Sequence, residues 1–304
     1  MIYNDYLYKI LCELEKENNF KVTGFSQNYI IEVKKNKDNV FYVYGNCFPL
    51  NNATSQKLCA DKSALSQILQ QNKIDCVKHK LFKHPSYDKN STFKNIKKEL
   101  ENNSQGVVCK DNKGFCGNNV FLAKTNYQLK KAIKQIFKNN LDLAISPFVN
   151  FEDEFRLIML NNECKVCYKK IRPFVIGNGK DNVKTLLGKN FNNLNFKIKK
   201  SLLKTIPKNN EKITLNWKHN LKLNSTPQVV TDKKLKQNLI NFAKKLTTLL
   251  NLNFCSVDLI IDKKIKVLEV NSIVSMNSFA NFNKDNYNKT KEVFLEAVNN
   301  SFNK

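Results

Sequence analysis

Apolar residues recur every three or four positions in several segments of the chain, which is the spacing of amphipathic helices. The clearest case is 233–250, where Leu235, Leu239, Phe242 and Leu246 would share one face. The same spacing predicts helices over about 2–18, 52–71, 92–100, 127–137, 233–250 and 289–298. The first of these lacks the basic start and the uninterrupted apolar run of a signal peptide.

Short runs rich in apolar and β-branched residues lie between these helices and predict strands. They cover 29–34, 40–44, 76–82, 106–110, 119–123, 143–149, 155–160, 163–171, 254–261 and 265–270. The last two flank Asp262-Lys263-Lys264 and are expected to form a hairpin. The pattern predicts an α/β (α+β) fold. We expect the Lys- and Asn-rich segment 190–224 to be the least ordered part.

Glycine and arginine are scarce, and both concentrate in one block of the chain. Only 8 of the 304 residues are glycine, and all but two of these lie between positions 106 and 188. Arg156 and Arg172 are the only arginines among 51 basic residues, and both fall in the same block. Glycine allows a backbone to approach a ligand closely, and arginine grips anions with a planar fork. We therefore expect residues 106–188 to bind a phosphate or carboxylate ligand.

The net charge of +25 raises the question of nucleic-acid binding. The lysines are spread through every segment, however, and the near absence of arginine disfavours that class of partner. The excess positive charge would still attract an anionic substrate over long range.

Nine cysteines without regular spacing argue against a complete disulfide framework and favour a reducing, cytoplasmic location. Cys164 and Cys167 form a CxxC, but no second CxxC or histidine pair lies nearby to complete a zinc site.

No stretch approaches 18 uncharged apolar residues, so we expect no membrane span. The sequence is compatible with a homo-oligomer.

A lysine precedes a glycine-bearing loop between two of the expected strands. Lys110 ends the first strand, and Gly114 and Gly117 lie in the loop before Val120. Such a loop can fold over a triphosphate while the lysine neutralises its oxygens. The alternative is an ordinary hairpin turn beside an exposed lysine.

Two acids and an amide interrupt otherwise apolar strands near the C-terminus. Strand alternation places Glu269 and Asn271 on one face, and a paired strand can bring Asp258 to that face. Hard oxygen ligands of this kind suit Mg²⁺, which shares them with nucleotide phosphates. The alternative is that these side chains lie at strand ends and face water.

The two arginines belong to a third constellation, which begins at Ser146-Pro147-Phe148 and continues through Glu154-Phe155-Arg156. Arg172 stands immediately before a proline, so its guanidinium is expected to be held in place. A fixed guanidinium can stabilise an oxyanion or a transferring phosphoryl group.

Taken in order, these segments resemble the ATP-grasp superfamily, which includes D-alanine–D-alanine ligase, glutathione synthetase, the ribosomal-protein glutamate ligase and cyanophycin synthetase. The resemblance covers roughly residues 55–285. It implies two lobes, each with an antiparallel-type sheet and helices, that clasp ATP. It also implies a short N-terminal region over 1–55 and an ATP-grasp domain over 56–304, with a lid lobe at about 85–145 and a core lobe at 146–304.

The resemblance assigns roles to residues that match the family's motifs. Lys62 and Lys110 would contact the phosphates. Gly114 and Gly117 would belong to the lid, and Glu154 would hold the ribose. Adenine would meet the main chain around Ser146 and Phe148. The magnesium ligands would be Asp258, Glu269 and Asn271, and the catalytic residues Arg156, Arg172 and Asn220. Mn²⁺ could substitute for Mg²⁺.

The sequence also departs from the family at three points. Ser146 stands where an acidic residue or glutamine is usual, and Asn178 replaces the aspartate of Gly-Asp-Gly. Lys222 and Asn224 stand where glycines usually follow the Asn-Leu segment, which bears on the substrate site.

The resemblance implies an ATP-dependent carboxylate–amine ligase that forms an amide or peptide bond. A substrate carboxylate would attack the γ-phosphate, and an amine would displace phosphate from the acyl phosphate. The substrates would be small molecules or peptides. Two alternatives are an inactive ATP-binding regulatory or partner-binding module and a basic nucleic-acid-binding protein.

Overall fold

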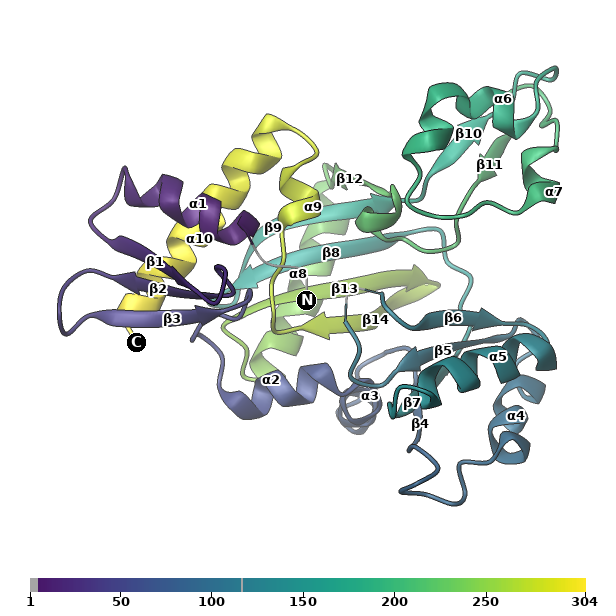
Figure 1. Cartoon of the computed structure of the whole chain (residues 1–304), viewed down its shortest axis with the longest axis horizontal. Coiled ribbons are helices and arrows are strands. Elements are labelled where there is room, and N and C mark those ends of the chain that lie inside the picture. The colour runs from purple at the N-terminus through teal and green to yellow at the C-terminus, as the bar shows by residue number, and fades with distance from the viewer. Residues whose placement is uncertain (1–4, 116) are drawn as a thin grey trace.

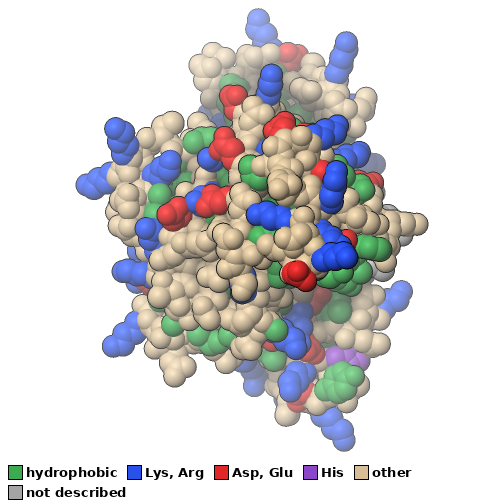
Figure 2. All heavy atoms as spheres, turned by 90° about the vertical axis from the view of Figure 1, so that its left-hand side faces the viewer, with side chains coloured by type: hydrophobic (Ala, Val, Ile, Leu, Met, Phe, Trp, Pro, Cys, Tyr) green, Lys and Arg blue, Asp and Glu red, His purple; other side chains and the backbone are tan. Residues whose placement is uncertain are grey.

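The computed structural model describes residues 5–115 and 117–304, which form several antiparallel sheets flanked by helices (Figure 1). The α/β fold class expected from the sequence is confirmed. Within these residues, no helix is both long enough and apolar enough to cross a membrane. Seen from the side of the N-terminal sheet, Lys and Arg side chains are scattered over the surface rather than gathered in one patch (Figure 2).

The N-terminal region is a three-stranded sheet whose apolar face packs on two helices. Its elements are α1 (Asp5–Glu15), β1 (Lys21–Phe25), β2 (Ile30–Lys34) and β3 (Val40–Tyr44). Ile31, Val33 and Val43 are fully buried against α1 and the C-terminal helix α10 (Lys284–Phe302). The first and last helices of the chain therefore share one hydrophobic core. The boundary at residue 55 stays a prediction.

Two short helices, α2 (Ala53–Ala60) and α3 (Lys62–Gln71), replace the single helix expected over 52–71. Asp61 divides them because it ends α2 and caps α3, where its side chain accepts from Ala64 N at 2.9 Å. This N-cap fixes Lys62 as the first residue of α3.

A four-stranded antiparallel sheet lies beyond α3, with one face covered by two helices (Figure 1). Its elements are β4 (Lys80–Phe82), α4 (Phe93–Glu101), β5 (Val107–Asp111), β6 (Val120–Ala123), α5 (Asn126–Phe137) and β7 (Leu143–Pro147), in the strand order β4-β7-β5-β6. Val107 and Cys109 pack under the helices. Because side chains alternate along a strand, Val108 and Lys110 point to the opposite face.

The largest sheet has five antiparallel strands in the order β12-β9-β8-β13-β14. The strands are β8 (Glu154–Leu160), β9 (Glu163–Ile171), β12 (Thr226–Val229), β13 (Phe254–Asp262) and β14 (Lys264–Asn271). The helix α8 (Lys233–Leu249) buries one face, together with α2 and α3. The short helix α9 (Asn277–Ala280) and α10 pack on one end of the other face. The expected hairpin of β13 and β14 is confirmed.

Residues between β9 and β12 form a small unit with a core of its own, and the expectation that 190–224 is the least ordered part stays a prediction. Its elements are β10 (Phe174–Ile176), α6 (Val183–Leu187), the 3-10 helix η1 (Gly188–Asn193), α7 (Lys200–Leu203), β11 (Lys212–Thr214) and the 3-10 helix η2 (Leu221–Leu223). Val175, Val183, Leu187 and Leu215 are its buried centre. Apolar residues set among the lysines pack on that centre.

Candidate functional site

Three charged side chains form a row across the middle of the five-stranded sheet. Asp258 on β13 is paired directly with Arg156 on β8 and with Glu269 on β14. Directly paired residues of antiparallel strands project from the same face, so the expectation that Asp258 and Glu269 share a face is confirmed. This face is the one opposite α8.

Asp258 lies in a buried network of charges. Arg156 Nε donates to its Oδ1 at 2.7 Å and Arg156 Nη2 to its Oδ2 at 2.5 Å, while Lys170 Nζ lies 3.0 Å from Oδ1. Lys170 also forms an ion pair with Glu154. Burial acts to raise the pKa of Asp258, but the charges of Arg156 and Lys170 outweigh it and hold the pKa at about 2. Asp258 is therefore a carboxylate at any ordinary pH.

Glu269 and Asn271 offer hard oxygen donors of the kind that magnesium prefers. Glu269 is the accessible acid, with a side chain 31% exposed against 3% for Asp258. Asn271 lies two residues farther along β14 and faces the same side. No group of three or more His, Cys, Asp or Glu side chains that could hold a metal ion occurs among residues 5–115 and 117–304. A cation would therefore need Asn271 and substrate oxygens to complete its shell.

Lys62 and Lys110 approach this row from α3 and β5. Lys62 Nζ lies 3.7 Å from Glu269 Oε1, and Glu269 and Glu154 both attract Lys110. Burial nevertheless lowers the pKa of Lys110, with the charge of Lys62 adding to the effect. Two lysines, two acids and a buried Arg–Asp pair thus converge between the two sheets.

The glycine loop after β5 is fastened to the start of α3. Asn112 is only 1% exposed, and its Oδ1 accepts from Ser63 N at 3.1 Å and from Ser63 Oγ at 3.0 Å. Lys62 Nζ donates to the carbonyl oxygen of Gly114. The loop is therefore hydrogen-bonded to Lys62, the lysine that is expected to contact phosphate.

Gly117 brings the far end of this loop against Asn220. Its φ of +73° is in the region that glycine favours, and a Cβ there would lie 2.8 Å from Asn220 Nδ2. The neighbouring Cys116 lies outside the described residues. Gly117 and Asn220, which were expected near ATP and near the substrate carboxylate, are thus adjacent.

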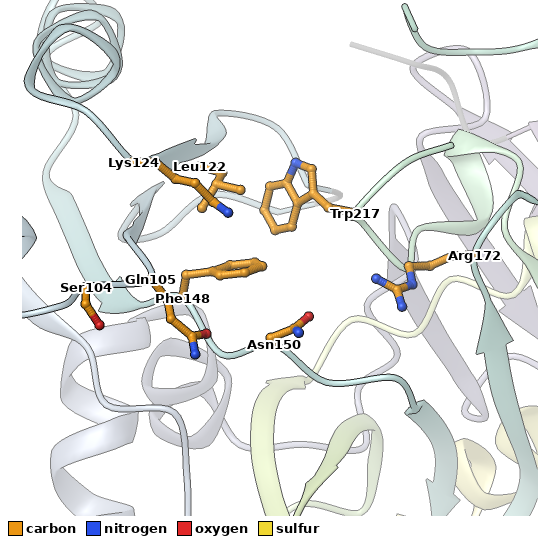
Figure 3. A pocket seen from close by; sticks show the side chains of 8 residues that line it. All are labelled: Ser104, Gln105, Leu122, Lys124, Phe148, Asn150, Arg172 and Trp217. Atoms are coloured by element: carbon orange, nitrogen blue, oxygen red, sulfur yellow. The ribbon is translucent and has the colours of Figure 1, made fainter. Parts of the chain in front are cut away.

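A cavity of about 410 Å³ opens where the four-stranded sheet, the linker after β7 and the small unit meet. Leu122 and Lys124 line it from β6 and its end, Phe148 and Asn150 from the linker, and Arg172 and Trp217 from the two ends of the small unit (Figure 3). The Phe148 and Trp217 rings face each other edge to face, with centroids 5.9 Å apart. Within the cavity lining, the charged side chains are both basic.

The linker after β7 is held by main-chain bonds. Ser146 is buried and paired with Val108 on β5, and Phe148 N donates to Gly106 O at 2.9 Å. The phenyl ring of Phe148 is thereby fixed at the cavity wall.

His219 is buried and lies close enough to Arg172 to be affected by its charge. Its Nδ1 donates to Lys170 O at 2.8 Å and its ring stacks on Phe151, with centroids 5.1 Å apart. Burial lowers the pKa of His219 to about 4, so the ring is neutral. Its Nε2 has no hydrogen-bond partner within the described residues.

Most of the sequence-predicted residues fall into two groups, while Gly117 and Asn220 lie together at the end of the glycine loop and Ser146 is buried on β7. Lys62, Lys110, Gly114, Glu154, Arg156, Asp258, Glu269 and Asn271 lie around the charged row, whereas Phe148 and Arg172 line the cavity. Sequence reasoning missed His79, Asn112, Lys170 and Trp217. Trp217 could have been singled out from the sequence, because it is the only tryptophan of the chain. Nothing in the sequence distinguishes Lys170 from the many other lysines.

Comparisons with known proteins agree with this architecture. Residues 59–184 match the model of the RimK-like ATP-grasp domain. No curated protein sequence matches the chain significantly. Among solved structures, the chain is similar to the D-alanine–D-alanine ligase from Bacillus anthracis, with 14% identity and a TM-score of 0.55 over 83% of this chain and 70% of that one.

Two further structures show the same fold. The Bacillus anthracis ligase complexed with ATP has 14% identity and a TM-score of 0.52, over 83% of this chain and 68% of that one. A bifunctional glutathione synthetase from Pasteurella multocida has 15% identity and a TM-score of 0.52, over 94% of this chain. This chain spans 43% of the length of that synthetase. The likeness to all three is one of fold.

Proposed function

We propose that the chain is an ATP-grasp ligase that joins a carboxylate to an amine through an acyl phosphate, with release of ADP and phosphate. The match of residues 59–184 to the RimK-like ATP-grasp domain, and the fold shared with the D-alanine–D-alanine ligase and the glutathione synthetase, support this proposal. The observation that carries this proposal is the convergence of Lys62 and Lys110 on the face that bears Asp258 and Glu269. Phosphoryl transfer needs this kind of site, since it depends on positioning and charge neutralisation rather than on a side-chain nucleophile.

The phosphates of ATP would lie against the two lysines. Lys62 would exchange the carbonyl oxygen of Gly114 for a phosphate oxygen, and the loop from Asn112 to Gly117 would order over the nucleotide. Mg²⁺, when bound by Glu269, Asn271 and Asp258, would neutralise the phosphate charge that develops during transfer. Glu154 would hold the ribose.

The base of the nucleotide would occupy the cavity beside Phe148 and Trp217. The two rings supply flat apolar surface, and the side chains of Gln105 and Asn150 supply amide donors and acceptors. The contact of Arg172 with the reacting oxyanion stays a prediction. The surroundings found for Arg172 are this cavity and the buried His219.

The carboxylate and amine would meet near Asn220, which lies beside the end of the glycine loop. Lysines and asparagines line this segment, so an anionic carboxylate substrate would not be repelled. We propose a free amino acid or a peptide as the amine.

Hydroxylamine tests the reaction directly. Purified protein is incubated with Mg-ATP, a panel of amino acids and peptides, and hydroxylamine in place of the amine. An acyl phosphate would be captured as a hydroxamate, with ADP formed in equal amount. Formation of AMP and pyrophosphate would show adenylation and overturn the proposal.

Nucleotide binding can be measured separately through Trp217. Because it is the only tryptophan, a change in intrinsic fluorescence on adding Mg-ATP reports on the cavity. A fluorescence change without ADP release on any panel member would instead favour an ATP-binding module that does not ligate.

A further inference from the structure

Lys110, the lysine at the centre of the proposed phosphate site, has a histidine as its hydrogen-bond partner. His79 Nε2 lies 3.2 Å from Lys110 Nζ, and His79 as a whole residue is 7% exposed. The ion pairs of the described residues include one between Lys62 and Glu269 but none of Lys110. The two neighbouring lysines are thus held in different ways.

The position of His79 is fixed by its backbone. His79 N donates to Ser66 Oγ on α3 at 3.1 Å, and two residues earlier Val77 N donates to Val267 O on β14 at 2.9 Å. The imidazole is therefore anchored to both elements that carry the other phosphate-site residues, Lys62 and Glu269.

The chemistry of the pair requires a neutral imidazole. An ammonium group only donates hydrogen bonds, so the His79 Nε2 must present its lone pair. Burial lowers the pKa of His79 well below its usual value, and the charges of Lys110 and Lys62 lower it further, against a hydrogen bond to the Val77 backbone. The ring therefore stays an acceptor across the working pH range.

A neutral acceptor and a carboxylate would act differently here. A carboxylate would direct Lys110 equally well but would cancel its charge, whereas an imidazole directs it and leaves the charge for the phosphates. We propose that His79 is a positioning residue that aims the Lys110 ammonium at the nucleotide phosphates without neutralising it. This inference rests on the proposed function.

The test compares four substitutions at position 79 by calorimetric binding of Mg-ATP and of adenosine. His79→Gln places an amide near the position of Nε2 and should bind ATP within about twofold of wild type. His79→Asn is too short to reach Lys110, and His79→Leu fills the space without an acceptor. Both should weaken ATP binding by about tenfold, the loss expected for one charge-assisted contact. His79→Glu should also weaken it, because it pairs with the lysine.

Two controls separate positioning from packing. Adenosine has no phosphates, so its affinity should be the same in all folded variants. In a Lys110→Ala background, His79→Leu should cause no further loss of ATP affinity, because the lysine that it positions is gone. A loss that adds fully to that of Lys110→Ala, or an equal loss for adenosine, would show that His79 only fills space.

The two proposals fail in distinguishable ways. A wild-type protein that binds no Mg-ATP overturns both. If Lys110→Ala weakens ATP binding but neither His79→Asn nor His79→Leu does, this inference alone is overturned. Thermal melting of each variant identifies any that do not fold, and the Gln–Asn comparison remains decisive because both side chains are amides.

Discussion

Arg156 and Asp258 are joined by two hydrogen bonds, from Nε to Oδ1 at 2.7 Å and from Nη2 to Oδ2 at 2.5 Å. Lys170 shares the same carboxylate at 3.0 Å. Asp258 is thus the common anion of the half-buried Arg156 and the buried Lys170, so we expect it to contribute to folding as well as to the proposed magnesium site. Glu269, its neighbour on β14, is not part of such a buried network and is more exposed.

This difference predicts opposite outcomes for two similar substitutions. Asp258→Asn keeps the shape of the side chain but leaves Arg156 and Lys170 without their shared charge, and it should lower the free energy of unfolding by roughly 3–5 kcal/mol. Glu269→Gln should change it by no more than about 1 kcal/mol, because its ion pair with Lys62 is half-exposed. Urea denaturation measures both. Equal stability of the two variants would show that the Asp258 network contributes nothing to folding.

Lys62→Ala should loosen the glycine loop. The substitution removes the hydrogen bond from Nζ to Gly114 O and leaves the loop held through Asn112. Trypsin should then cut after Lys113, which is exposed in that loop, several-fold faster than in wild type. Lys57→Ala, on the exposed side of α2, is the control and should leave cleavage unchanged. Unchanged cleavage in Lys62→Ala would mean that Asn112 alone fixes the loop.

Gly117→Ala should weaken Mg-ATP binding by about tenfold. A methyl group there would be strained at φ +73° and would press on Asn220 Nδ2, a cost of about 1–2 kcal/mol. Gly188→Ala is a matched control, since Gly188 also has a positive φ but nothing lies within 4 Å of its added Cβ. That variant should lose stability without losing ATP affinity. Equal ATP affinity in the two variants would argue against closure of the loop over the nucleotide.

The neutral state of His219 predicts a pH-dependent loss of stability. Its folded-state pKa of about 4 lies below the usual 6.5, so the unfolded chain binds the extra proton between these values. Stability should therefore fall as pH drops from 6.5 towards 4, by roughly 3 kcal/mol for this group.

The matched experiment uses His219→Gln, which cannot take up that proton. The difference in unfolding free energy between variant and wild type should move in favour of the variant as pH falls from 7 to 4, while carboxylate titrations common to both cancel. A difference that does not change with pH would mean that His219 is protonated in the folded protein.

The strand-level features of the site could be predicted from the sequence. Alternation along β14 and the expected hairpin predicted that Glu269 and Asp258 share a face, and the register confirms it. The direct pairing of the two residues depends on a β-bulge between Asp258 and Leu259, which shifts the register by one residue and which no local pattern predicted. The roles given to these residues stay predictions.

The partners of those residues could not be predicted. His79 meets Lys110 across 31 positions, and Lys170 meets Asp258 from a strand far away in sequence. Such contacts follow from the packing of whole elements, and no local spacing encodes them. Apolar spacing alone predicted one helix over 52–71. The resemblance implied a helix opening at Asp61-Lys62, and Asp61 does cap α3 there.

The shared core of α1, the N-terminal sheet and α10 has a consequence for biosynthesis. The first strands leave the ribosome long before α10 is made. Ile31 and Val43 therefore cannot complete their hydrophobic cluster until Val293 and Phe294 of α10 have been synthesised. Meanwhile the four-stranded sheet, whose strand pairs and hydrophobic core lie within residues 80–147, can fold as soon as it emerges. We expect nascent chains that lack α10 to carry a folded middle and an unfolded beginning, and to depend on chaperones until synthesis ends.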